Sequence, residues 1–263
     1  CRQRGAGQRQ ITIKSGIMEK NEYIFGIRAV MEAIEAGRQI DKVLMRRDLG
    51  GDLARELQKM IQEYDVVMQK VPLEKLNRIT MKNHQGVVAL LSPVEYYRLE
   101  NLLPEIYEEG RVPKILVLDG ITDNRNFGAI ARTAECAGFD TIVIPQRNSV
   151  TVNADAVKTS AGALLHIPVC REREMAQALK YLKESGCKVI GATEKGVTDY
   201  SNVDCTVPIA IVMGSEDTGM SRDVIKLCDE LVAIPIEGNI GSLNVSVAAG
   251  VMMYEVVRQR RKS

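Results

Sequence analysis

Three short stretches combine glycine with polar or charged side chains, and each follows an apolar run. They are ITDNRNFGAIAR at 121–132, GSEDTGMS at 214–221 and EGNIGSLNVS at 237–246. Glycines let a ligand approach the backbone closely, and serine, asparagine and glutamate supply hydrogen-bonding groups beside it. Each stretch is also compatible with an ordinary polar turn.

Arg132 adds a fixed positive charge to the first stretch. It lies one helical turn beyond Gly128 and Ala129, and long helical side chains lean back over the preceding turn. We therefore expect the Arg132 side chain to lie over Gly128 and Ala129, which carry almost no side chain. This leaves an open groove beside a positive charge. The alternative is a solvated arginine on an amphipathic helix.

The sequence lacks the motifs of several common types of active site. The sequence has no GxxxxGK[ST], no HExxH and no GxGxxG after a strand, which argues against P-loop, zincin and ordinary dinucleotide sites. The two histidines, His84 and His166, are interpreted as structural. A Ser-His-Asp triad would therefore lack its catalytic histidine. The cysteines are at least 17 residues apart with no CxxC pair, and we expect no metal site.

The elements that must position these loops form an alternation of strands and helices after residue 114. Apolar strands are expected at 115–118, 141–144, 164–169, 188–192, 208–213 and 231–236. Strands this apolar, separated by helices, favour a parallel sheet covered on both faces, whose ligand site lies at the carboxyl ends of the strands. The last helix, expected from Ser242 to Arg258, is apolar almost all round, so it is buried deeply or packs against another chain.

Residues 17–100 read as a smaller α/β layer without an acid/base cluster, which is typical of a recognition module. A stretch at 101–113 contains Pro104, Gly110 and Pro113 and is predicted to link the two domains.

The composition argues against a membrane-spanning or secreted protein. The 263 residues have 45% hydrophobic residues and no run of 18 apolar residues, and the first 16 lack the apolar core of a signal peptide. We expect a cytoplasmic protein with no membrane segment and with buried, reduced thiols.

The net charge of +1 conceals an uneven distribution. Residues 1–16 carry four basic and no acidic residues, residues 256–263 do the same, and the rest of the chain is therefore net acidic. Basic ends on an acidic body are predicted to be arms for a polyanion such as RNA; solvated, frayed termini are the other interpretation.

The three stretches together resemble one family. Asn126, Gly128 and Arg132, then the G-S-E loop at 214–216, then I-P-I at 234–236 with S-L-N-V-S at 242–246, are similar in order to the SpoU (TrmH-type) RNA 2′-O-ribose methyltransferases of the SPOUT superfamily. The segments YIFGIRAVMEAI at 23–34 and HQGVVAL at 84–90 resemble the L30e-like substrate-binding domain of a subset that includes bacterial 23S rRNA guanosine-2′-O-methyltransferases.

The resemblance implies a fold and a cofactor. It implies an α/β chain with a flexible basic arm at 1–16, an L30e-like RNA-binding domain at 17–100, a linker at 101–113 and a SPOUT domain at 114–263 with a deep trefoil knot. It implies S-adenosylmethionine as cofactor and a homodimer formed through the knot. The cofactor-binding residues would be Thr193, Gly214, Ile234, Ile236 and Leu243.

The resemblance also implies a reaction, the methylation of a ribose 2′-hydroxyl in RNA, with a guanosine of 23S rRNA as the expected target. The catalytic group would comprise Arg132, Asn126, Glu216, Ser242 and Asn244, with Glu216 holding Arg132 or Asn126 in place. Arg46, Arg47 and Lys82 are the expected RNA contacts, with ordinary solvated surface as the alternative.

Other functions stay open at this point. Within the family, a tRNA methylase or an antibiotic-resistance rRNA methylase would use the same catalytic residues. Outside it, a non-catalytic RNA-binding protein or a nucleotide-dependent enzyme of small metabolites remains, and the latter lacks its glycine fingerprint.

Overall fold

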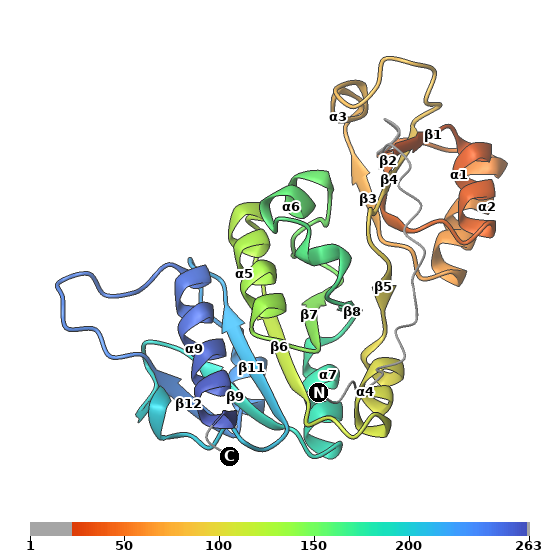
Figure 1. The fold of residues 1–263 in the computed structure, drawn as a ribbon. Helices are drawn as coiled ribbons and strands as arrows, with labels where there is room; N and C mark the ends of the chain where they lie inside the picture. Colours follow the sequence, from red (N-terminus) through yellow and green to blue (C-terminus); the bar gives the residue numbers. More distant parts are fainter. Residues whose placement is uncertain (1–22, 262–263) are drawn as a thin grey trace, which may run out of the picture.

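The computed structural model describes residues 23–261, which form two α/β domains joined by the segment around β5 and α4 (Figure 1). The predicted arm at 1–16 lies outside the described residues. None of the helices within 23–261 is long and apolar enough to cross a membrane.

The N-terminal domain is a four-stranded sheet with strand order β1-β4-β2-β3. Helices α1 and α2 cover one face through a core that includes Val30, Leu57 and Val87, and α3 covers the other face through Leu76. Its elements are β1 (Tyr23–Phe25), α1 (Ile27–Glu35), β2 (Ile40–Arg46), α2 (Asp52–Glu63), β3 (Met68–Val71), α3 (Leu73–Asn77) and β4 (Val87–Leu91).

The C-terminal domain has an eight-stranded sheet with order β10-β12-β9-β11-β6-β7-β8-β5, and every pairing in it is parallel. Its strands are β5 (Tyr96–Tyr97), β6 (Lys114–Asp119), β7 (Thr141–Pro145), β8 (Val169–Glu172), β9 (Lys188–Ala192), β10 (Thr198–Asp199), β11 (Ile209–Gly214) and β12 (Glu230–Ala233). The prediction of a parallel sheet is confirmed.

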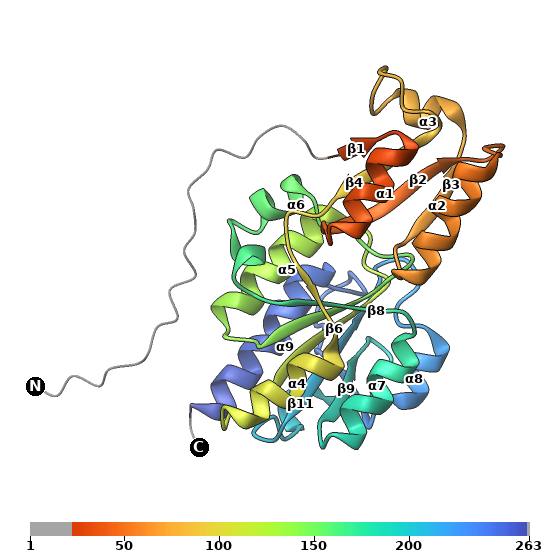
Figure 2. The same ribbon diagram turned by 90° about the vertical axis from the view of Figure 1, so that its right-hand side faces the viewer.

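Helices cover both faces of this sheet, as expected (Figure 2). Helices α5, α6 and α9 pack on one face, and α4, α7 and α8 pack on the other, each over its own apolar core. Their bounds are α4 (Leu99–Glu108), α5 (Asn124–Cys136), α6 (Ala154–Thr159), α7 (Met175–Glu184), α8 (Arg222–Leu227) and α9 (Val245–Arg260).

The stretch predicted as a linker is mostly helix α4. Pro104 sits inside it, and Leu103 and Ile106 are buried, with Leu103 packed against the large sheet. Because β5 already pairs with β8, the chain enters the second sheet at Tyr96, earlier than the sequence indicated.

The strand predicted at 164–169 is wrong. Ala161 and Gly162 have left-handed backbone conformations that turn the chain, a short 3₁₀ helix spans Ala163–Leu165, and β8 begins only at Val169. His166 is therefore exposed on a connection, whereas His84 is buried and hydrogen-bonded to Asn77.

The chain returns from β12, the neighbour of the edge strand β10, to the middle of the sheet at its C-terminal end. After β12 an extended segment, 234–244, leads to α9, which packs on α5 and β11. Such a return places the last helix beside α5, a helix formed much earlier in the chain. The trefoil knot itself stays a prediction.

Two of the four basic residues in the C-terminal stretch 256–263 contact the rest of the protein. Arg258 pairs with the buried Glu255, and the Arg260 guanidinium donates to the carbonyls of Cys205, Val112, Pro113 and Val207. These contacts fasten the end of α9 to the domain.

Most described cysteines have the environment expected of reduced thiols. Burial raises the pKa of Cys170 to about 12 and the pKa values of Cys205 and Cys228 to about 11, so these thiols stay protonated at neutral pH. Cys136 differs because it is exposed on α5.

Candidate active site

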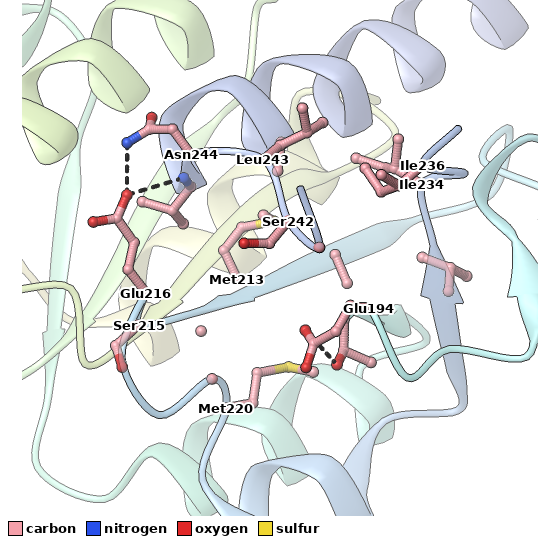
Figure 3. A pocket seen from close by; sticks show the side chains of 18 residues that line it. Glu194, Met213, Ser215, Glu216, Met220, Ile234, Ile236, Ser242, Leu243 and Asn244 are labelled. Carbon is pink, nitrogen blue, oxygen red and sulfur yellow. Dashed lines mark hydrogen bonds between the residues drawn. The ribbon is translucent and has the colours of Figure 1, made fainter. Parts of the chain in front are cut away.

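A cavity of about 250 Å³ opens at the carboxyl edge of the large sheet, where β9, β11 and β12 end (Figure 3). The segment 234–244 and the first residues of α9 complete its wall. All five residues predicted to bind the cofactor line this cavity: Thr193, Gly214, Ile234, Ile236 and Leu243.

Gly214 is required by a close backbone approach. The chain folds back after β11 so that Ser215 and Gly219 exchange two backbone hydrogen bonds, of 3.2 and 2.9 Å. A Cβ at Gly214 would collide with the backbone nitrogen of Met220 and the backbone of Gly219. The loop can therefore form this wall only with glycine at its start.

Three of the residues predicted to be catalytic meet beside the cavity, although they are far apart in the sequence. The Asn244 Nδ2 donates to Glu216 Oε1 at 2.6 Å and to Asn126 Oδ1 at 3.1 Å. Glu216 Oε1 also accepts from the backbone nitrogen of Val245 at 3.2 Å. One residue from each of the three glycine-containing stretches thus joins a single network.

The residues of this network lie at the N-terminal ends of α5 and α9. Asn244 is the N-cap of α9, where its Oδ1 accepts from the backbone nitrogen of Ser246, so the helix begins at Val245 and not at Ser242 as expected. The Glu216 carboxylate lies at the N-terminus of α9, where the partial positive charge of the helix favours an anion. Asp123 caps α5, because its carboxylate accepts from the backbone nitrogens of Arg125 and Asn126.

Arg132 lies away from these contacts. It is exposed on α5, does not line the cavity, and makes no hydrogen bond or ion pair with the residues from 23 to 261. Glu216 does not hold Arg132; it reaches Asn126 only through Asn244.

The expected open groove beside Arg132 is also absent. Gly128 is buried, and a Cβ there would lie 2.7 Å from Thr159 Cβ and 3.1 Å from the backbone nitrogen of Ser160. This glycine therefore serves the close packing of α5 against α6.

The remaining predicted residues fall into two places. Ser242 is exposed on the cavity wall. Arg46 is the last residue of β2 in the N-terminal domain and pairs with Asp48, Arg47 follows it, and Lys82 lies 5.9 Å from the centre of the Phe25 ring. The structure thus places the cavity and its polar network in one domain and the three residues expected to contact RNA in the other.

Sequence reasoning missed part of the wall. Glu194, Met213 and Met220 also line the cavity, and Figure 3 shows Glu194 and Met220 on the side opposite Asn244. Glu194 follows the predicted strand 188–192 by two residues, so its place at a strand's carboxyl end was the available signal. Among the described residues, no cluster of His, Cys, Asp or Glu has the makings of a metal site.

Comparison with known proteins gives matches over both domains. Residues 113–254 match the SpoU rRNA Methylase family, and residues 23–97 match the RNA 2′-O ribose methyltransferase substrate binding family. A Staphylococcus aureus protein named putative TrmH family tRNA/rRNA methyltransferase is 40% identical over 237 residues, which cover 90% of this chain and 96% of that one.

Solved structures show the same likeness. The SpoU methyltransferase AviRb from Streptomyces viridochromogenes, in complex with the cofactor AdoMet, is 26% identical, with a TM-score of 0.58 over 92% of this chain and 91% of that chain. The TrmH/SpoU tRNA modifying enzyme of A. aeolicus is 27% identical, with a TM-score of 0.53 over 62% of this chain and 85% of that one. With a family match over more than half of its length and a relative at this identity, the chain belongs to the SpoU rRNA methylase family.

Proposed function

We propose that this chain transfers a methyl group from S-adenosylmethionine to the 2′-hydroxyl of a ribose in structured RNA, with a guanosine of 23S rRNA as the target. The observation that carries the proposal is the network of Asn126, Glu216 and Asn244 at the mouth of the cavity. The substrate-binding match over 23–97 supports RNA as the substrate.

The cavity has the chemistry that this cofactor requires. Met213, Met220 and Val232 give it an apolar wall for the flat adenine ring, and the tight turn at Gly214 exposes backbone groups. Glu194 and Glu216 place two carboxylates at the wall, which complement the positive ammonium and sulfonium groups. When bound, S-adenosylmethionine supplies an electrophilic methyl group on sulfur.

The protein's task is then to position a weak nucleophile. A ribose hydroxyl must be aligned with the methyl group and must lose its proton as the new C–O bond forms. Ser242 is exposed on the cavity wall and placed to bind the ribose, while Asn244, held by Glu216 and Asn126, shapes the wall beside it. Arg132 is exposed and unpaired within the described chain, so it can meet a phosphate and orient the incoming nucleotide.

The test is to incubate the protein with tritiated S-adenosylmethionine and separate pools of 23S rRNA and tRNA, then to map the labelled ribose. We expect label on a 2′-oxygen in 23S rRNA. Label only in tRNA would overturn the proposed target, and cofactor binding without transfer to either pool would favour a non-catalytic RNA-binding protein.

Helix α9 supports a homodimer. Its outer side exposes Val247 (52%) and Tyr254 (51%), two large apolar side chains two turns apart on a helix that otherwise packs inward. Apolar surface of this kind is typical of a protein contact. We place the active dimer in the cytoplasm, and light scattering of Val247→Glu should show monomers where the unaltered chain gives dimers.

A further inference from the structure

A second cavity, of about 290 Å³, lies between the two domains and has no part in the chemistry above. Loops before β2 and β3 form one side, and β5 with residues at the ends of β7 and β8 forms the other. Aromatic and guanidinium groups share its wall: Tyr64, Tyr96, Tyr97, Arg38, Arg98 and Arg171.

The floor of this interdomain pocket is fixed by contacts that cross between domains. The buried Asp41 of β2 accepts from the Tyr96 hydroxyl at 3.0 Å and pairs with Arg171 at 3.3 Å. The Arg171 guanidinium lies 4.6 Å from the centre of the Tyr96 ring. Burial and the nearby Asp41 raise the Tyr96 pKa well above its usual value, so the hydroxyl remains a donor.

The open side of the pocket presents groups that are not committed to internal contacts. Tyr64 is 52% exposed and Tyr97 is 39% exposed. Arg38 is exposed, and no ion-pair partner for it exists among residues 23–261. The wall thus offers two accessible rings and an unpaired cation over a rigid floor.

The pocket lies along the same sheet edge as the candidate active site. Gln146 follows β7 directly and Arg171 lies in β8, while the cofactor cavity takes β11 as one wall. Three strand spacings separate β11 from β8, roughly 14 Å, because neighbouring strands lie about 4.8 Å apart. An RNA strand whose ribose sits at Ser242 spans that distance within a few nucleotides.

We propose that the interdomain pocket binds one unpaired nucleotide of the RNA substrate, with its base against Tyr64 and Tyr97 and its phosphate at Arg38. The proposal rests on the proposed function for its substrate class. Unpaired bases stack on aromatic rings, and guanidinium groups bind phosphate strongly. Among the described residues four tyrosines are exposed, and two of them, Tyr64 and Tyr97, line this one pocket.

The test compares a fluorescein-labelled single-stranded RNA of mixed sequence with the same RNA annealed to its complement, using the full chain. We expect the double variant Tyr64→Leu/Tyr97→Leu to weaken single-strand binding at least about tenfold and to leave duplex binding unchanged. Tyr64→Phe/Tyr97→Phe keeps the rings and should keep the affinity. Arg38→Gln should lower the salt dependence of single-strand binding, whereas Arg55→Gln, a remote exposed control, should not.

The outcomes separate this proposal from the proposed function. Equal single-strand affinity for the Leu double variant, with unfolding temperature unchanged, would overturn the pocket. Equal loss for single strand and duplex would also overturn it, since a paired base cannot enter. Selective loss by a protein that methylates no RNA pool would support the pocket and refute the methyltransferase assignment.

Discussion

The side-chain amide of Asn244 uses both of its hydrogens, one for Glu216 and one for Asn126. This leaves its nitrogen saturated while Ser242 and Arg132 keep free groups toward solvent. The static part of the candidate site and the part available to substrate are therefore different residues. At the residue scale, this division predicts that Arg132 acts on RNA and not on the cofactor.

Arg132→Ala is expected to lower single-turnover methyl transfer by about two to three orders of magnitude, as loss of a charge-stabilising group does. Cofactor affinity measured by calorimetry should change little, because Arg132 does not line the cavity. Arg55→Ala, which changes an exposed arginine of α2 in the N-terminal domain, serves as the control. Full activity of Arg132→Ala would refute its assignment.

Gly214→Ala tests the wall itself. Its Cβ would meet the backbone of Met220, so we expect destabilisation of about 1–3 kcal/mol together with weakened cofactor binding. Gly238→Ala is the matched control, since nothing lies within 4 Å of a Cβ there. Thermal unfolding and calorimetry of the two variants should differ; similar behaviour would argue against a tight turn at Gly214.

At the scale of the elements, the three glycine-containing stretches become a site because each one joins a strand end to a helix or a tight turn. Asn126 lies in the first turn of α5, Asn244 caps α9, and Glu216 follows β11. Two helix N-termini and one strand end thus converge on one corner of the sheet.

Asn244 both caps α9 and joins the side-chain network with Glu216 and Asn126, and two variants can separate these roles. Asn244→Ala removes both the helix cap and the amide, and should cost about 1 kcal/mol of stability. Asn244→Ser keeps a capping oxygen and should retain stability in urea unfolding. Both should lose methyl transfer, and an active Asn244→Ser variant would show that the amide network is dispensable.

Much of the fold and the wall could be predicted from the sequence. Apolar runs at 115–118 and 188–192 lie in strands, and the strand-end rule pointed to the loop at Gly214, whereas Thr193 was indicated by the family resemblance alone; both line the cavity. The role of Gly128 and the position of Arg132 could not be predicted, because α6 covers that part of α5 and this packing has no local signal. The 3₁₀ turn at Ala163–Leu165 was misread as strand because its residues are as apolar as a strand's.

At the scale of the whole molecule, ion pairs across the domain junction fix how the two domains meet. Asp41 pairs with Arg171, and Asp65 with Arg173, while Gln146 donates to the Asp65 carbonyl at 3.1 Å. The first pair is buried at both ends, since Asp41 is fully buried and the Arg171 side chain is 11% exposed.

Arg171→Met should therefore destabilise the protein by about 3–5 kcal/mol in urea unfolding, because it leaves the Asp41 carboxylate buried without its partner. Adding Asp41→Asn should recover part of that loss. Arg55→Met, which breaks an exposed pair with Asp52, should change stability by less than about 1 kcal/mol. A loss from Arg171→Met as small as that of the control would mean that the junction is not held by this pair.

The order in which the cavity's walls occur along the chain has a consequence for biosynthesis. Strands β9, β11 and β12 are made before the segment 234–244 and the start of α9, which supply the last wall and the Asn244 amide. A nascent chain that has not yet reached residue 245 lacks that wall and the hydrogen bonds that join Asn126 to Glu216. Cofactor binding and methylation are thus withheld from incomplete chains, and a ribosome translating this message releases active protein only after α9 has been synthesised.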